Sequence, residues 1–380
     1  MRYVFKNKIL CATCAIIDAM GEVCTFLPRK LKRPLLPSEI KTILVVRLDH
    51  IGDVLYATSV PALLKGRFPN ARIVFLVGSW AKEIVSGNPY IDETLVFDAP
   101  WFNRKSLRAF SMRSFFNLAK RLKSYHFDLG LDLRGDCRHI FLMTLGKVAF
   151  RIGFGITGGR FLLHHCVSYD AALRPSERNI QLLSVLGIQA LKAEPVLYSQ
   201  PSNVSEAKAF LKKHQLDANG IAIMHPCAGT SVKNWRDARF AALADRLAKE
   251  FLLKVMFVGA SEDKGRIDSI VQMCAIKPLN AAGEFSLKTL VEVLKAARLF
   301  VGIDSGPGHL ASCVGIPTVL LYSGTNTSDA WAPQGKRTVV VEKQISCKAC
   351  ERAECLDTIC MDLISVNDVI GAVRQVWQKA

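Results

Sequence analysis

The sequence predicts an α/β protein of two domains, each built on a parallel β-sheet with helices on both faces. Apolar runs alternate with helical patterns from Thr42 onward, and a second series of the same kind begins near Gly220. The chain has 380 residues, half of them apolar, which is too long for one hydrophobic core. The border between the domains is expected in the Pro- and Ser-rich stretch 194–204.

The individual elements follow from the hydrophobic pattern. A nearly continuous apolar run of four to eight residues is typical of a parallel strand buried on both faces. Such runs predict strands over residues 42–48, 71–77, 94–97, 127–133, 221–224, 254–258, 299–303 and 317–322. Helical patterns cover residues 54–67, 238–251, 287–296, 308–314 and 366–379. We therefore expect an extension over residues 1–40, two Rossmann-like domains over 41–197 and 198–363, and a C-terminal helix over 364–380.

Two interpretations of residues 1–40 remain open. One is a solvated linker that ends in four basic residues between two prolines, at 28–34. The other is an amphipathic helix over residues 4–27, followed by a basic segment that binds anionic lipid headgroups. The apolar run 9–27 does not qualify as a membrane span, because Asp18 and Glu22 interrupt it.

Charge and cysteine content limit the partners and the compartment. The formal net charge of +17 indicates an acidic partner: nucleic acid, an anionic membrane surface or a phosphorylated substrate. The twelve cysteines are mostly scattered in a chain long enough to fold without disulfides, so a reducing compartment is expected. No clear signal-peptide cleavage site follows the first apolar run. The prediction is a cytoplasmic protein that rests on the inner face of the inner membrane.

The first strand-to-helix loop contains a candidate general base. Asp53 follows Gly52 at the start of a predicted helix, at the carboxyl end of the first strand. Open α/β sheets bind ligands at this edge, and a carboxylate there can accept a proton. A simple N-cap is the structural alternative. The dinucleotide fingerprint GxGxxG is absent from this loop, which argues against an NAD- or FAD-dependent oxidoreductase.

Three loops of the second domain have the composition of an anion site. Small residues let the backbone approach a phosphate, while hydroxyls, a lysine and a helix N-terminus supply donors. Residues 225–235 resemble a phosphate cradle without a Walker A motif, and a glutamate after the next strand could bind ribose hydroxyls. The candidate residues in these loops are Thr230, Ser231, Lys233, Glu262, Asp304, Ser305 and Gly306.

Several segments in this order resemble one known family. They are RLDHIGDVLYATSVPALLKGRFPNARIVFLVG, FDLGLDLRG followed by FRIGF, HPCAGTSVKNW, and VGIDSGPGHLASCVGIPTVLLYSGT with Trp331 and Pro333. Together they are similar to glycosyltransferase family 9, the ADP-heptose:lipopolysaccharide heptosyltransferases. The resemblance runs from about residue 41 to residue 376 and does not include residues 1–40.

The resemblance implies a GT-B fold, in which two Rossmann-like domains with parallel sheets face each other across a cleft. It implies an inverting, metal-independent transfer without a cofactor, from an ADP-heptose-like nucleotide sugar to a lipid A/core oligosaccharide acceptor. The N-terminal domain would hold the acceptor and the C-terminal domain the donor.

Residue by residue, the family's catalytic aspartate corresponds to Asp53. Its hydroxyl residues and phosphate-binding lysine correspond to Thr230, Ser231 and Lys233, and its nucleoside-binding glutamate to Glu262. The family's Asp-Ser/Thr-Gly-x-x-His loop matches Asp304, Ser305, Gly306 and His309.

Two further features remain open. The stretch 102–123 holds seven basic and no acidic residues, and is either a solvated helix face or a contact surface for a phosphorylated acceptor. Its Arg104, Lys105 and Arg108, together with Gly52, are the weaker acceptor-binding candidates. No nucleic-acid-binding motif accompanies this charge. The thiols of a C-terminal cluster could bind a structural metal such as zinc, form disulfides or stay reduced: Cys347, Cys350, Cys355 and Cys360.

Two other functions compete with glycosyl transfer. A sugar-nucleotide epimerase of similar fold would turn over the nucleotide sugar without an acceptor. A non-catalytic anion-binding module would not need the carboxylate of Asp53.

Overall fold

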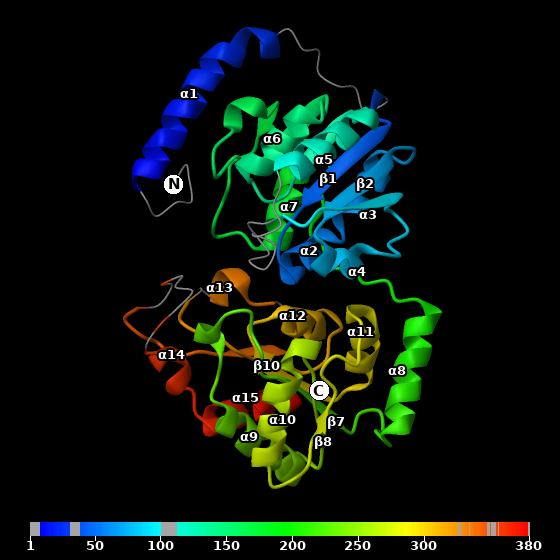
Figure 1. Ribbon diagram of the computed structural model, residues 1–380, viewed down its shortest axis with the longest axis vertical. Coiled ribbons are helices and arrows are strands. Elements are labelled where there is room, and N and C mark those ends of the chain that lie inside the picture. Colours follow the sequence, from blue (N-terminus) through cyan, green and yellow to red (C-terminus); the bar gives the residue numbers. More distant parts are fainter. Residues whose placement is uncertain are drawn as a thin grey trace. The chain divides into compact units, whose positions relative to one another are not determined.

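The computed structural model describes residues 8–30, 39–99, 112–325, 328–333, 335–347, 350, 355 and 357–378. The chain divides into two compact units, Met1–Tyr198 (unit 1) and Ser199–Ala380 (unit 2), each with a six-stranded parallel sheet (Figure 1). The predicted α/β class is confirmed. Among the described residues, no helix combines the length and the apolar character needed to cross a membrane.

The sheet of unit 1 has the strand order β3-β2-β1-β4-β5-β6. Its strands are β1 (Thr42–Arg47), β2 (Arg72–Val77), β3 (Glu93–Val96), β4 (Leu129–Asp132), β5 (Phe150–Gly153) and β6 (His165–Cys166). The central strand β1 is buried from its second residue onward, as its apolar run predicted. β1 pairs with β2 and β4, so the loops after these three strands leave the same edge of the sheet.

Helices cover both faces of this sheet. They are α2 (Ile51–Ala57), α3 (Val60–Arg67), α4 (Lys82–Val85), α5 (Met112–Ser124), α6 (Cys137–Leu145) and α7 (Pro175–Ser184). α5 and α6 pack on one face, around a core that includes Phe115, Leu122 and Ile140. The single helix expected over 54–67 is wrong: Pro61 stands in the first turn of a new helix, α3, after a break at Thr58 and Ser59.

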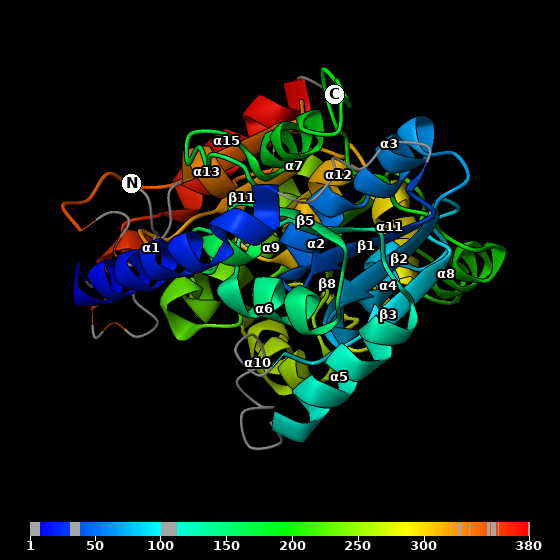
Figure 2. The same cartoon turned by 90° about the horizontal axis from the view of Figure 1, so that it is seen from above.

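The N-terminal helix α1 (Lys8–Lys30) packs against unit 1 at the 3₁₀ turn η4 (Arg160–Leu162), and Figure 2 shows it beside α6. The fully buried carboxylate of Asp18 accepts hydrogen bonds from the backbone N–H groups of Gly159 and Arg160, at 2.8 and 3.0 Å. Gly21 leaves room for the ring of Phe161, which a Cβ atom at that position would meet at 2.2 Å.

The orientation of α1 is unusual for an amphipathic helix on a folded domain. Its buried contact is a charged group, whereas its exposed side chains include Ile9, Ile16, Met20 and Val23. A free linker is therefore wrong for residues 8–30. The basic residues Lys32 and Arg33 lie outside the described residues.

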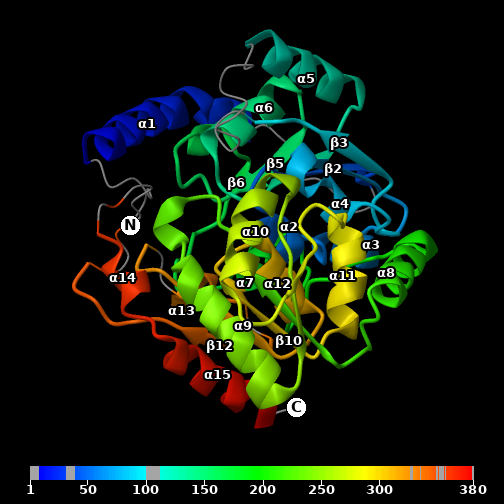
Figure 3. The ribbon, with the colours of Figure 1, turned by 60° about the horizontal axis from the view of Figure 1, so that its bottom comes forward.

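The sheet of unit 2 has the order β12-β11-β10-β7-β8-β9. Its strands are β7 (Ile221–His225), β8 (Lys254–Phe257), β9 (Leu279–Asn280), β10 (Leu299–Ile303), β11 (Thr318–Leu321) and β12 (Thr338–Val341). Its helices are α8 (Pro201–Lys213), α9 (Asp237–Phe251), α10 (Lys264–Met273), α11 (Leu287–Ala296), α12 (Gly306–Cys313), α13 (Ser328–Trp331), α14 (Ile359–Asp362) and α15 (Val366–Gln378). α9, α10 and α15 share one core with the sheet, and α8 packs on α11 (Figure 3).

Candidate active site

In unit 1, the candidate base Asp53 lies in the first turn of α2, directly after β1. It is 8% exposed, and its Oδ1 accepts a hydrogen bond from the guanidinium of Arg47, the last residue of β1, at 2.8 Å. It does not cap its helix, because the N-cap position belongs to His50. Asp53 is thus a buried carboxylate held by an arginine at the carboxyl end of the central strand.

A second carboxylate, Asp49, lies in the same loop and has a different environment. Asp49 contacts two guanidinium groups, that of Arg47 at 3.4 Å and that of Arg134. It also accepts the backbone N–H of His50 at 3.0 Å. Arg134 comes from the loop after β4 and its side chain is 34% exposed, so two neighbouring strand ends contribute to one cluster of charges.

The two carboxylates have opposite pKa shifts. Burial, followed by the negative charge of Asp49, raises the pKa of Asp53 to about 6, although Arg47 opposes this shift. Burial also disfavours the charged form of Asp49, but Arg47 and Arg134 outweigh it, so the pKa of Asp49 is lowered. Asp49 therefore stays ionised while Asp53 can exchange a proton near neutral pH.

In unit 2, the loops after β7 and β10 bring three of the predicted residues together. Nζ of Lys233 lies 2.6 Å from Asp304 Oδ2, and Nε2 of His309 lies 3.9 Å from Asp304 Oδ1. β7 and β10 are neighbouring parallel strands, which explains why residues 71 positions apart meet. Burial lowers the pKa of His309, so this histidine is neutral at pH 7 and Lys233 carries the positive charge.

Ser305 is held by a residue that sequence reasoning did not select. It is the N-cap residue of α12, and its hydroxyl donates to the carbonyl of Ile303 and lies 3.1 Å from Nδ1 of His225. Burial lowers the pKa of His225 to about 4, so its ring is neutral. The backbone N–H of Gly306 begins α12, at the positive end of the helix dipole.

The remaining donor candidates lie on exposed loops of the same sheet. Ser231 begins a 3₁₀ turn after β7, and Thr230 precedes it in extended conformation. Glu262 lies in the exposed turn after β8, the other neighbour of β7.

Some predicted residues fall outside this description. Arg104, Lys105 and Arg108 lie outside the described residues, and the basic helix α5 follows them in the chain. All twelve cysteines are free thiols, and Cys360 packs against the core of unit 2. Within the described ranges, no group of three or more His, Cys, Asp or Glu side chains is arranged to hold a metal ion.

The sequence profile of glycosyltransferase family 9 (heptosyltransferase) matches residues 115–359. The chain belongs to this family. The predicted resemblance is therefore confirmed, and the protein is a glycosyltransferase with the GT-B fold. Membership of this family does not favour the alternative of a non-catalytic anion-binding module.

Individual relatives support the assignment to family 9. Lipopolysaccharide heptosyltransferase 3 of Escherichia coli is 27% identical over 282 residues, which cover 72% of this chain and 81% of that protein. The crystal structure of the family 9 glycosyl transferase from Veillonella parvula has a TM-score of 0.77 at 23% identity, and the match covers 90% of this chain and 98% of that one. The E. coli heptosyltransferase WaaC with ADP-2-deoxy-2-fluoro heptose has a TM-score of 0.64 at 17% identity, over 88% and 99% of the two chains.

Arg47, Arg134 and His225 are the residues that sequence reasoning missed. Arg47 stands in the quoted motif RLDHIGD, and its position at a strand end beside two aspartates could have signalled an ion pair. Arg134 and His225 become partners of the site only through strand pairing, which no local pattern reveals.

Proposed function

We propose that this family 9 glycosyltransferase transfers a heptose from ADP-heptose to a saccharide hydroxyl of a lipopolysaccharide-core acceptor. In this proposal the transfer inverts the anomeric centre and needs neither metal nor cofactor. The observation that carries it is Asp53, a buried carboxylate whose pKa of about 6 suits a general base at neutral pH. The names of the relatives support the choice of sugar and acceptor.

In the proposed step, an Oδ of Asp53 takes the proton from the acceptor hydroxyl as its oxygen attacks the anomeric carbon. The bond from that carbon to the diphosphate breaks, and the electron pair leaves with the nucleoside diphosphate. Arg47 keeps the carboxylate of Asp53 in place by the 2.8 Å hydrogen bond, and the negative charge of Asp49 raises the pKa of Asp53, which makes its ionised form a stronger base. One base and one leaving group give inversion in a single displacement.

The leaving diphosphate accumulates negative charge, which unit 2 can stabilise. Lys233 is the positive group of its cluster, and the N-terminus of α12 presents the N–H groups of Ser305 and Gly306. Charge-assisted hydrogen bonds of this kind contribute roughly 1.5–3 kcal/mol each. In this assignment Thr230 and Ser231 add hydroxyl donors, Glu262 binds the nucleoside, and Asp304 and His309 orient Lys233.

The test is a transfer assay with purified full-length protein, ADP-heptose and lipopolysaccharide-core acceptors of increasing length. We expect release of ADP that requires both the acceptor and the donor, and a glycosylated product by mass spectrometry. Turnover of the nucleotide sugar without any acceptor would instead favour the epimerase alternative. If ADP-hexoses react at the same rate, the proposal of heptose as the transferred sugar is contradicted, while the proposed transfer reaction stands.

We also propose that unit 1 associates peripherally with the anionic cytoplasmic face of the inner membrane. The exposed apolar residues Ile9, Met20 and Val23 of α1 and the basic helix α5 support this. Full-length protein is expected to co-sediment with phosphatidylglycerol-containing vesicles at low salt and to detach at high salt. Equal sedimentation with neutral vesicles would contradict an electrostatic contribution to membrane binding. Absence of sedimentation with any vesicle would contradict the proposed membrane association.

A further inference from the structure

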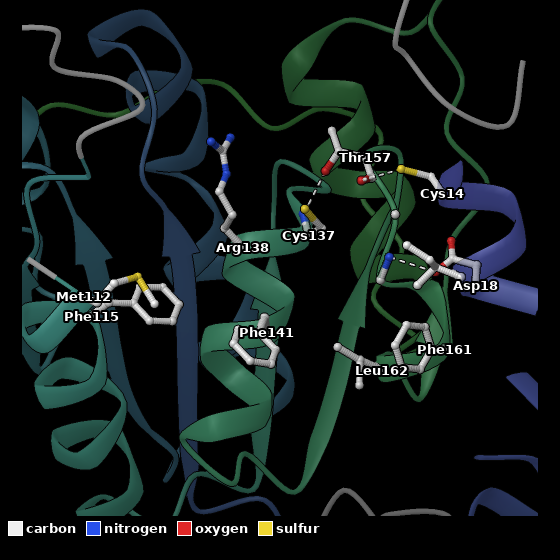
Figure 4. A pocket seen from close by; sticks show the side chains of 13 residues that line it. Cys14, Asp18, Met112, Phe115, Cys137, Arg138, Phe141, Thr157, Phe161 and Leu162 are labelled. Atoms are coloured by element: carbon white, nitrogen blue, oxygen red, sulfur yellow. Dashed lines mark hydrogen bonds between the residues drawn. The ribbon is translucent and has the colours of Figure 1, made fainter. Parts of the chain in front are cut away.

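An apolar cavity of about 520 Å³ lies in unit 1 between α1, α5, α6 and the turn η4. Figure 4 shows Met112 and Phe115 on one side, Phe141 of α6 in the middle, and Phe161 and Leu162 beside α1. The rings of Phe115 and Phe141 are stacked, with centroids 6.3 Å apart. The volume lies within the roughly 300–1,000 Å³ of ordinary small-molecule sites.

The polar groups of the cavity wall are already hydrogen-bonded within the protein. Asp18 accepts two backbone N–H groups of η4, and Thr157 Oγ1 accepts the N–H of Cys137 at 2.8 Å. The thiol of Cys14 donates to the carbonyl of Thr157 at 3.8 Å. A ligand rich in polar groups would lose hydrogen bonds to water here without gaining new ones, so the wall favours a hydrocarbon chain.

At one end of the cavity, ion pairs connect the wall to the candidate catalytic cluster. Arg138 lines the cavity at the start of α6 and points away from the phenylalanine rings in Figure 4. Arg138 Nε donates to Asp136 Oδ1 at 2.7 Å, and Nε of Arg134 lies 3.6 Å from Asp136 Oδ2. Arg134 in turn pairs with Asp49, the neighbour of Asp53. A continuous series of ion pairs therefore joins the cavity to the proposed base within one unit.

The charge around the cavity selects among possible occupants. α5, which forms one wall, carries Arg113, Lys120, Arg121 and Lys123 and no acidic residue. A second copy of a chain with net charge +17 would be repelled by this surface. An amphiphile with one hydrocarbon chain and a negatively charged polar end matches both the apolar wall and the basic surroundings.

We propose that this cavity binds one acyl chain of the lipid-linked acceptor, with the anionic saccharide end directed past Arg138 toward Asp49 and Asp53. The inference rests on the proposed function, which supplies an acceptor that combines an acyl chain and an anionic saccharide in one molecule. It adds that the enzyme recognises the lipid part of its acceptor, with α1 as one wall of the binding site.

The first experiment measures acyl-chain binding without any transfer reaction. Full-length protein is titrated with cis-parinaric acid, a fluorescent fatty acid, and the Phe141→Asn variant is compared with Phe116→Asn. The two phenylalanines are 44% and 49% exposed and both contact the ring of Phe115, but only Phe141 lines the cavity. We expect about 5- to 10-fold weaker binding for Phe141→Asn, because apolar contact area is lost, and no change for Phe116→Asn.

A second matched pair lies on α1. Ile17 lines the cavity and Ile16 does not, although both are more than half exposed. Ile17→Asn is expected to weaken binding of the fluorescent fatty acid about 5-fold, whereas Ile16→Asn should leave this binding unchanged. If the two variants of each pair have equal effects, the proposed site is wrong. It is also wrong if the wild-type protein shows no saturable binding of cis-parinaric acid, whatever the transfer assay shows.

The second experiment tests whether the acyl chain in the cavity belongs to the acceptor or to a bilayer lipid. The KM values for an acylated acceptor and its deacylated form are measured with wild-type protein, Phe141→Asn and Phe116→Asn. We expect Phe141→Asn to raise KM about 5-fold for the acylated acceptor alone, with kcat and the deacylated substrate unaffected. If Phe141→Asn instead weakens vesicle binding and leaves both KM values unchanged, the chain belongs to a bilayer lipid and the acceptor assignment is wrong. Failure of heptose transfer with intact probe binding would contradict the proposed function and leave the acyl-chain site standing.

Discussion

The two clusters of charged side chains in this glycosyltransferase differ in how deeply their residues are buried. In unit 1, Arg47, Asp49 and Asp53 are all less than 9% exposed, and two carboxylates share the arginine. In unit 2, Lys233 pairs with Asp304 on loops, and the side chains are 23% and 10% exposed. Burial beside another negative charge raises the pKa of a carboxyl group toward 7. A more exposed lysine keeps its positive charge and can exchange its carboxylate partner for another anion. The first environment suits proton transfer and the second suits anion binding.

The largest expected effect separates the two clusters by function. Asp53→Asn keeps the shape of the side chain and removes the base, so kcat should fall at least about 100-fold. Binding of the nucleotide sugar, measured by calorimetry, and the melting temperature should remain near wild type.

The matched variant is Asp49→Asn, in the same loop. It removes a carboxylate that contacts two arginines and should reduce stability more than Asp53→Asn does. Near-normal turnover of Asp53→Asn would show that Asp53 is not the base, and a loss confined to Asp49→Asn would assign this role to Asp49.

The converse change is Lys233→Ala. It should weaken binding of ADP and of the donor about 10- to 100-fold, since a charge-assisted hydrogen bond contributes roughly 1.5–3 kcal/mol. Calorimetry with each ligand measures this directly. Lys249→Ala, at an exposed position of α9, is the control and should bind as the wild type does. Unchanged affinity of Lys233→Ala would remove this lysine from the site.

The pH profile sharpens the same comparison. Because the pKa of Asp53 is raised to about 6 and the base acts in its ionised form, kcat/KM should fall as pH drops through about 6, by roughly tenfold per unit below it. Asp49→Asn removes a charge that raises this pKa, so the acidic limb should move to lower pH. If kcat/KM of the wild-type protein falls only near pH 4, Asp53 is not the titrating base. The same conclusion follows if Asp49→Asn leaves the pH of this fall unchanged.

The smallest expected effect is in unit 2. The pKa of His225 is lowered to about 4 and that of His309 is also lowered, in both cases chiefly by burial. Both rings are therefore mainly neutral between pH 7 and 8, and the donor diphosphate, substituted at both ends, does not titrate there. Donor affinity without acceptor should change less than about twofold over this range. A larger pH dependence would show that a group of the donor site titrates near neutrality.

The sequence by itself determined the fold class, the two domains and the family. Buried parallel strands have nearly continuous apolar runs, so β1, β2, β7 and β10 could be recognised within a residue or two. The short edge strands β6 and β9, each two residues long, left no pattern and were missed. The motif loops also identified Asp53, Lys233 and Asp304 as candidates, because small and charged residues at strand ends have few purely structural uses.

The tertiary structure alone decided which residues interact. Strand order brings Arg134 to Asp49 and His225 to Ser305 across eighty or more positions, and no local pattern encodes such pairings. The direction of the pKa shift of Asp53 depends on burial and on two neighbouring charges, which exist only in the folded unit. The same holds for α1, for which a helix was one of two interpretations of the sequence. Only folding shows that Asp18 is its buried contact, where the backbone N–H groups of Gly159 and Arg160 replace the hydrogen bonds to water.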